Sequence, residues 1–128
     1  MTDCRHIFIS HAWKYDDAYS TVVSWLKDLP IKNYSVPQTD PLHIMSNARL
    51  KDALAEQIRH ASIVIIISGM YAAYSDWMEY EILEAKRQDK YIIALRPWGQ
   101  ERVPAVIQQN ANVMVGWNRA SLIKAIFN

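Results

Sequence analysis

The sequence predicts an α/β fold in which helices cover both faces of a parallel sheet, and three observations support this class. Short apolar, β-branched segments alternate with segments of helical periodicity along the 128 residues. The segment SIVIIIS (62–68) shows no polar alternation, as expected for a strand buried on both faces. Alternating strands and helices favour right-handed crossovers between parallel strands. We therefore expect a five-stranded sheet in the order 2-1-3-4-5, with 62–68 at its centre.

Each element follows from its local pattern. Strands are expected at 5–10, 33–36, 62–68, 91–97 and 112–117. Helices are expected at 15–29, 47–61, 76–89, 103–109 and 119–127. Pro30 ends the first helix, and Pro104 opens the fourth. The strand at 33–36 has the weakest pattern, and the segment VPQTDPLH (36–43) after it reads as a loop because it holds two prolines and an aspartate.

Length and composition limit the kinds of partner. Residues 1–128 fit one domain, and about half of them are apolar, so the chain can bury a core. The net charge is +1, with basic residues scattered along the chain, which favours neither nucleic acid nor a membrane as partner. One cysteine, Cys4, and an N-terminus without signal-peptide features predict a cytoplasmic protein.

Several chemistries lack the residues that they need. With three glycines, the sequence contains neither GxGxxG nor GxxxxGK[ST], the loops that cradle phosphates. A response-regulator receiver would need acids after the first and third strands, where this chain has SHA and Ser68-Gly69. The four histidines lack ligand-like spacing, so we expect no metal.

Three acids follow the central strand within one helix. At about 100° per residue, its apolar stripe comprises Met78, Ile82 and Ala85. Glu81 lies about 65° from the centre of that stripe, Glu79 about 95° and Glu84 about 125°. Glu81 is therefore the acid nearest the buried edge. The periodicity leaves two interpretations open, because acids early in a helix also complement its dipole without any chemical role.

Two segments resemble a known family. RHIFISHAWKYD (5–16) resembles the opening box of Toll/interleukin-receptor (TIR) domains, in the TIR-like branch associated with bacterial Thoeris antiphage systems. SDWMEYEI (75–82) resembles the second box, S-x-W-x-x-x-E-[IL], on which Ser75, Trp77, Glu81 and Ile82 fall. The resemblance implies a flavodoxin-like, TIR-like three-layer fold.

The resemblance also implies an activity. In enzymatic TIR domains the glutamate at the position of Glu81 is catalytic, and the reaction cleaves the nicotinamide–ribose bond of NAD. This implies an enzyme of the NAD glycohydrolase or ADP-ribosyl cyclase type, which takes NAD as substrate and needs no cofactor. The product would be ADP-ribose or a cyclic isomer that signals to a separate effector protein in antiviral defence. Self-association, or association with other TIR-like domains, is a further expectation.

Supporting residues follow from their place in the fold. Ser10, His11 and Ala12 lie at the carboxyl end of the first strand, the sheet edge where ligands of such folds bind, so we expect them to line the site and His11 to approach Glu81. Trp77 either stacks on the substrate or packs its helix on the sheet. Two alternative functions stay open: a non-catalytic TIR-like interaction module, and a nucleoside deoxyribosyltransferase-like enzyme.

Overall fold

A computed structural model describes residues 4–10, 16–34, 47–67, 75–96, 103 and 105–127. Within these ranges strands and helices alternate in the order β1 (Arg5–Ser10), α1 (Asp16–Leu26), β2 (Ile31–Asn33), α2 (Asn47–His60), β3 (Ile63–Ile67), α3 (Ser75–Arg87), β4 (Tyr91–Leu95), α4 (Ala105–Asn110), β5 (Val113–Val115) and α5 (Arg119–Phe127). None of these helices has both the length and the apolar character of a bilayer-spanning segment.

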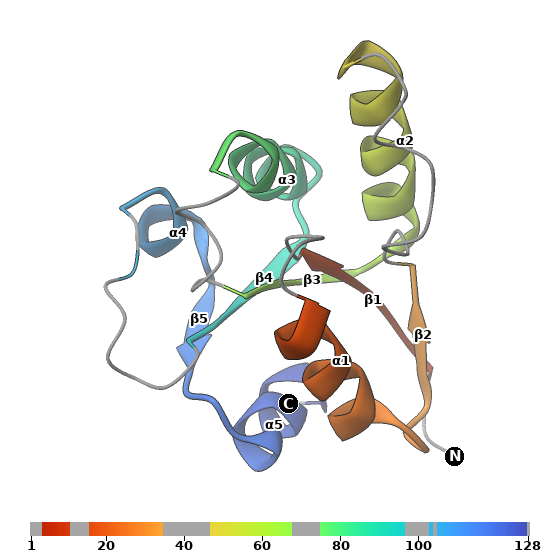
Figure 1. Ribbon diagram of the computed structural model, residues 1–128, viewed down its shortest axis with the longest axis vertical. Coiled ribbons are helices and arrows are strands. Elements are labelled where there is room, and N and C mark those ends of the chain that lie inside the picture. Colours follow the sequence, from red (N-terminus) through yellow and green to blue (C-terminus); the bar gives the residue numbers. More distant parts are fainter. Residues whose placement is uncertain are drawn as a thin grey trace.

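The strands form one parallel sheet in the order β2-β1-β3-β4-β5, which confirms the predicted class and order (Figure 1). β3 is central, and all five of its residues are buried. Ser10, the last residue of β1, pairs with Ile66 of β3, which in turn pairs with Ala94 of β4. This register places the carboxyl ends of β1, β3 and β4 side by side.

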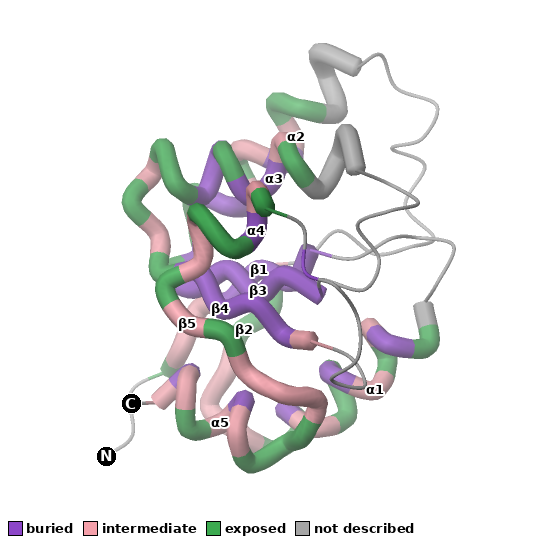
Figure 2. The backbone as a smooth tube through the Cα atoms, turned by 90° about the vertical axis from the view of Figure 1, so that its left-hand side faces the viewer, coloured by how far each residue is buried: buried purple, intermediate pink, exposed green. Residues whose placement is uncertain are grey.

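Helices cover both faces of the sheet. α2, α3 and α4 lie on one face, whereas α1 and α5 lie on the other (Figure 1). Adjacent residues of each strand point to opposite faces, so two cores form. Phe8 and Ile66 pack toward α2, α3 and α4, while Ile7, Ile9 and Ile65 pack toward α1 and α5. The central strands are buried along almost their whole length (Figure 2).

Two elements differ from their predicted bounds by three residues at one end, each for a local reason. α1 ends at Leu26 rather than at 29, because Asp28 adopts a left-handed conformation with φ of 69°, which a helix cannot continue through. The second strand is Ile31–Asn33 rather than 33–36. Its pairing starts straight after the turn, where the Arg5 N–H donates to the Pro30 carbonyl at 2.8 Å and Ile31 pairs with Arg5. The predicted loop at 36–43 lies outside the described residues.

Candidate active site

Ser10 enters the site through the alternation of β1. Ile7 and Ile9 point toward α1 and α5, so Phe8 and Ser10 point to the opposite face, beneath α3. Ser10 is completely buried and is the last residue of its strand. A polar side chain thus ends an otherwise apolar face, at the carboxyl edge where ligands of open parallel sheets bind.

Glu81 enters the site from the second turn of α3. Ile82 and Ala85 of this helix are fully buried in the core above the sheet. Glu81 lies beside them, where the helical periodicity places it, and is only 6% exposed. A carboxyl group buried to this degree is costly unless it is neutral or paired, so its surroundings determine its chemistry.

The two buried side chains meet. The Ser10 hydroxyl donates a hydrogen bond to Oε1 of Glu81 at an Oγ–Oε1 distance of 2.5 Å, which is short for a hydrogen bond between oxygens. The bond joins two residues 71 positions apart in sequence. It fixes the helix acid over the carboxyl end of β1, beside the neighbouring strand β3.

The carboxyl group of Glu81 is a weak acid and not a permanent anion. Burial raises the pKa of Glu81 to about 8, and the hydrogen bond from Ser10 partly opposes this rise. In the absence of a ligand, Glu81 is therefore largely protonated at neutral pH. Perturbed acids of this kind are typical of functional sites, and either a proton donor or, after ionisation, a carboxylate is available here.

Other predicted site residues fall outside the described part of the chain. These are His11, Ala12 and the side chain of Trp77. The expected approach of His11 to Glu81 therefore stays a prediction. The described contact to Glu81 comes from Ser10, which the sequence places in the site but does not pair with the acid. The alternation of side chains along β1 could have predicted this contact. It places Ser10 on the same face of the sheet as Phe8, the face that α2, α3 and α4 cover.

Angles of about 95° and 125° from the apolar stripe predict that Glu79 and Glu84 are solvated, and for Glu84 this prediction is wrong. Glu84 is 8% exposed and forms an ion pair with Arg87, whose Nε donates to Oε1 at 2.9 Å. Gln88 donates to Oε2 at 2.5 Å and also to the carbonyl of Ala55 on α2. The angle from the apolar stripe predicts burial against the sheet only. α2 packs against α3 from the side and covers this acid. Glu79 is exposed, as expected.

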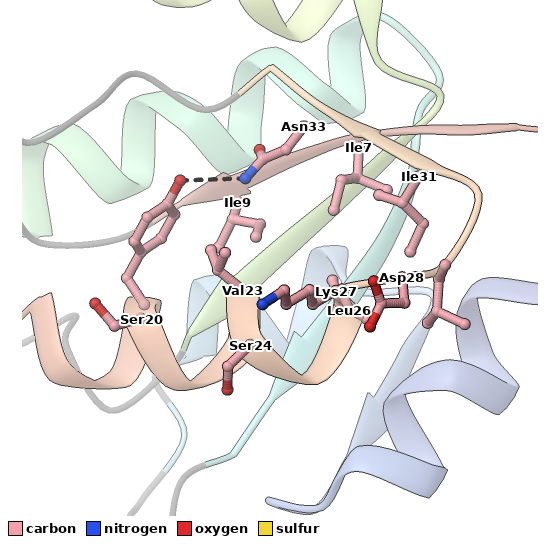
Figure 3. A pocket seen from close by; sticks show the side chains of 12 residues that line it. Ile7, Ile9, Ser20, Val23, Ser24, Leu26, Lys27, Asp28, Ile31 and Asn33 are labelled. Atoms are coloured by element: carbon pink, nitrogen blue, oxygen red, sulfur yellow. Dashed lines mark hydrogen bonds between the residues drawn. The ribbon is translucent and has the colours of Figure 1, made fainter.

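A groove of about 530 Å³ lies away from these acids. It opens between α1 and the β1–β2 edge, with Ile7, Ile9 and Ile31 at its base and Lys27 at its rim (Figure 3). Ile7 and Ile9 belong to the core on the α1 and α5 side. The sheet therefore separates this groove from Ser10 and Glu81. Within the described ranges, no group of three or more His, Cys, Asp or Glu side chains is arranged to share a metal ion.

The fold and the buried acid define an α/β domain with a candidate active site at the carboxyl edge of its sheet. Residues 8–102 match the family described as "Thoeris protein ThsB, TIR-like domain". The match spans most of the chain and includes both Ser10 and Glu81. The chain belongs to this TIR-like domain family of Thoeris ThsB proteins.

The fold also occurs in a solved structure. A structure described as Clostridium botulinum CMP N-glycosidase, BcmB, is similar with a TM-score of 0.65 and 16% sequence identity. The similarity covers 94% of this chain and 96% of that one. At this identity it shows a shared fold. No curated protein matches the sequence.

Proposed function

We propose that this domain cleaves the N-glycosidic bond between nicotinamide and ribose in NAD, with Glu81 as the catalytic carboxyl group. The observation that carries the proposal is the buried contact between Glu81 and Ser10 at the carboxyl edge of the sheet. Membership of the ThsB TIR-like family supports it, because enzymatic TIR domains place their catalytic glutamate at the matching position of the second box.

The chemistry needs one acid. When the C1′–N bond breaks, its electron pair leaves with the nicotinamide nitrogen, which becomes neutral, and the ribosyl carbon becomes cationic. An ionised Glu81 stabilises that oxocarbenium centre. Water then attacks C1′ and releases a proton, giving ADP-ribose; attack by an adenosine group of the same molecule instead gives a cyclic isomer.

Ionisation of Glu81 is coupled to the charge of the substrate. Its pKa of about 8 reflects burial, which the hydrogen bond from Ser10 partly opposes. The positive nicotinamide ring of NAD brings a positive charge close to the acid, which favours the carboxylate. Binding of NAD therefore moves Glu81 toward the charge state that the reaction uses.

A second candidate function is cleavage of a nucleotide with a neutral base. The similar fold of a protein described as a CMP N-glycosidase favours this candidate. Cytosine is a poor leaving group unless it receives a proton, and Glu81 is largely protonated near pH 7. In this reaction Glu81 would act as a general acid, so the two candidates require opposite charge states of one residue.

The experiment that tests the proposal incubates the pure protein with NAD or CMP from pH 6 to pH 9, with products identified by mass spectrometry. We expect NAD cleavage that rises with pH toward about 8. Cleavage of CMP that falls over the same range would replace NAD with the second candidate. The protein is purified both from uninfected cells and from phage-infected cells. If neither preparation cleaves NAD or CMP, the result would favour the alternative of a non-catalytic interaction module.

The acids of α3 provide matched variants. Glu81→Gln keeps the shape of the side chain and removes its charge, and we expect turnover of NAD to fall about 10²–10³-fold. Glu79→Gln changes an exposed acid two residues earlier and should leave turnover within a few fold. An active Glu81→Gln variant, in a preparation whose parent cleaves NAD, would remove Glu81 from the mechanism.

The proposed product gives the domain a place in antiviral defence. We propose that ADP-ribose or a cyclic isomer is released as a signal to a separate effector protein. Self-association of the domain, or association with other TIR-like domains, would then control when the signal is made. Identification of the product by mass spectrometry separates the linear, cyclic and conjugated forms.

A further inference from the structure

Ser10 has a position that suits it to act on Glu81 rather than on substrate. Its side chain is completely buried, and its hydroxyl makes the 2.5 Å contact to Oε1 of Glu81. Ile66 lies beside it in the register and is also fully buried. Because Ser10 has no exposed surface, its hydroxyl bonds to the carboxyl group of Glu81 and not to solvent.

A hydroxyl is suited to an acid that changes its charge. It has one donor hydrogen and two acceptor lone pairs. It can donate to Oε1 when Glu81 is ionised, and it can accept the carboxyl proton when Glu81 is neutral. The contact between Ser10 and Glu81 therefore persists in both charge states, whereas a backbone N–H or an ammonium group, which can only donate, would favour the ionised form.

The contact also leaves half of the carboxyl group for the reaction. Ser10 engages Oε1, and no second hydrogen bond to the Glu81 side chain occurs within the described part of the chain. Fixing one oxygen limits rotation of the carboxyl plane about its last torsion, which is otherwise broad. Oε2 then has a defined position relative to the sheet edge.

Building on the function proposed above, we propose that Ser10 is the positioning residue of Glu81, holding Oε1 in both charge states so that Oε2 is presented to the ribosyl carbon. This role differs from a substrate contact. A substrate contact would affect binding, whereas a positioning residue affects the rate of the bond-breaking step and the titration of the acid.

Two variants test the role in the whole protein. Ser10→Ala removes the hydroxyl, and Ser10→Thr retains it. We expect Ser10→Ala to lower kcat for NAD about 10- to 100-fold, with KM changed less than about threefold. The hydrogen bond from Ser10 lowers the pKa of Glu81, so its loss should move the midpoint of the kcat pH profile upward. Ser10→Thr should restore both.

Ser62→Ala is the matched control. Ser62 lies just before β3, at the other end of the sheet, and its hydroxyl donates to the His6 carbonyl at 3.3 Å. Its loss should change neither kcat nor the pH midpoint. A rise in KM with unchanged kcat in Ser10→Ala would overturn the proposal and make Ser10 a substrate contact. Unchanged kcat and pH midpoint in Ser10→Ala would also overturn it.

A direct titration separates this proposal from the proposed function. If the parent does not cleave NAD, the proposed function fails, but the Glu81 carboxyl can still be followed by ¹³C NMR. We expect its midpoint to rise in Ser10→Ala and to return in Ser10→Thr. Equal midpoints in the parent and Ser10→Ala would overturn the positioning role whether or not the protein is active.

Discussion

Glu81 and Glu84 lie less than one turn apart on α3, and both are buried, yet their surroundings differ. Glu84 forms an ion pair with Arg87, which lowers its pKa. Glu81 has a neutral hydroxyl as its partner, and burial raises its pKa to about 8. A buried acid without a cation destabilises the folded chain once it ionises. Its presence at the carboxyl edge is therefore consistent with the catalytic role proposed above.

The raised pKa makes a prediction about stability and pH. An acid whose pKa is higher in the folded state keeps a proton that the unfolded chain has released. Its stabilising effect is complete below the unfolded value of about 4.5 and is lost as pH rises through about 8. The loss should be on the order of a few kcal/mol. Glu81→Gln has no titrating group at this position, so its free energy of unfolding should not show this loss.

Thermal melts between pH 5 and pH 8 measure this effect. We expect the melting temperature of Glu81→Gln to rise relative to the parent as pH increases. Glu79→Gln, at an exposed position of the same helix, should keep a constant difference from the parent. A difference between Glu81→Gln and the parent that does not change with pH would mean that Glu81 is ionised throughout this range.

At the scale of the element, α3 packs against the sheet, α2 and α4. The sheet covers the stripe that contains Ile82 and Ala85, while α2 covers the side that contains Glu84. Tyr80 also crosses to α2, where its hydroxyl donates to the Lys51 carbonyl at 3.0 Å. A helix that is buried on more than one side can carry two buried acids in different surroundings.

Glu84 therefore has a predicted structural role. Glu84→Gln removes the charge that pairs with Arg87, and we expect a loss of about 1 kcal/mol in the free energy of unfolding. NAD turnover should stay within a few fold. Glu56→Gln is the matched control, since Glu56 forms the same i,i+3 pair with Arg59 but is 53% exposed. Urea unfolding measures the loss in the free energy of unfolding for both variants. Equal losses would show that the burial of Glu84 does not strengthen its ion pair.

The elements with strong periodicity could be predicted from sequence, and those defined by tertiary contacts could not. The uniformly apolar β3 identified the centre of the sheet, and the apolar stripe of α3 placed Glu81 at a buried edge. β2 has three residues at the sheet edge, so its position depends on pairing with β1 rather than on its own pattern. The burial of Glu84 depends on a helix that lies more than 20 residues earlier in the sequence.

At the scale of the whole molecule, the sheet divides the interior into two cores, and only one of them includes the candidate site. Ile65 and Ile66 are adjacent on the central strand, and both are completely buried. Ile65 packs in the core beneath α1 and α5, together with Ile9, while Ile66 packs in the core that contains Phe8 and Ile82. Stability depends on both cores, but the geometry of Ser10 and Glu81 depends on the second.

This division predicts that two equal substitutions have different consequences. Ile65→Val and Ile66→Val each remove one buried methylene from β3, and each should lower the free energy of unfolding by about 0.5–1.5 kcal/mol. Ile66 pairs with Ser10 in the register, so the space left by Ile66→Val lets the Ser10–Glu81 contact shift. Because small displacements of catalytic groups slow a reaction strongly, kcat for NAD should fall several-fold in Ile66→Val and stay at the parent value in Ile65→Val. Urea unfolding and steady-state kinetics on the same preparations measure both quantities. A parallel loss of kcat in the two variants would show that turnover follows overall stability, and that the core beneath Glu81 has no separate influence on the site.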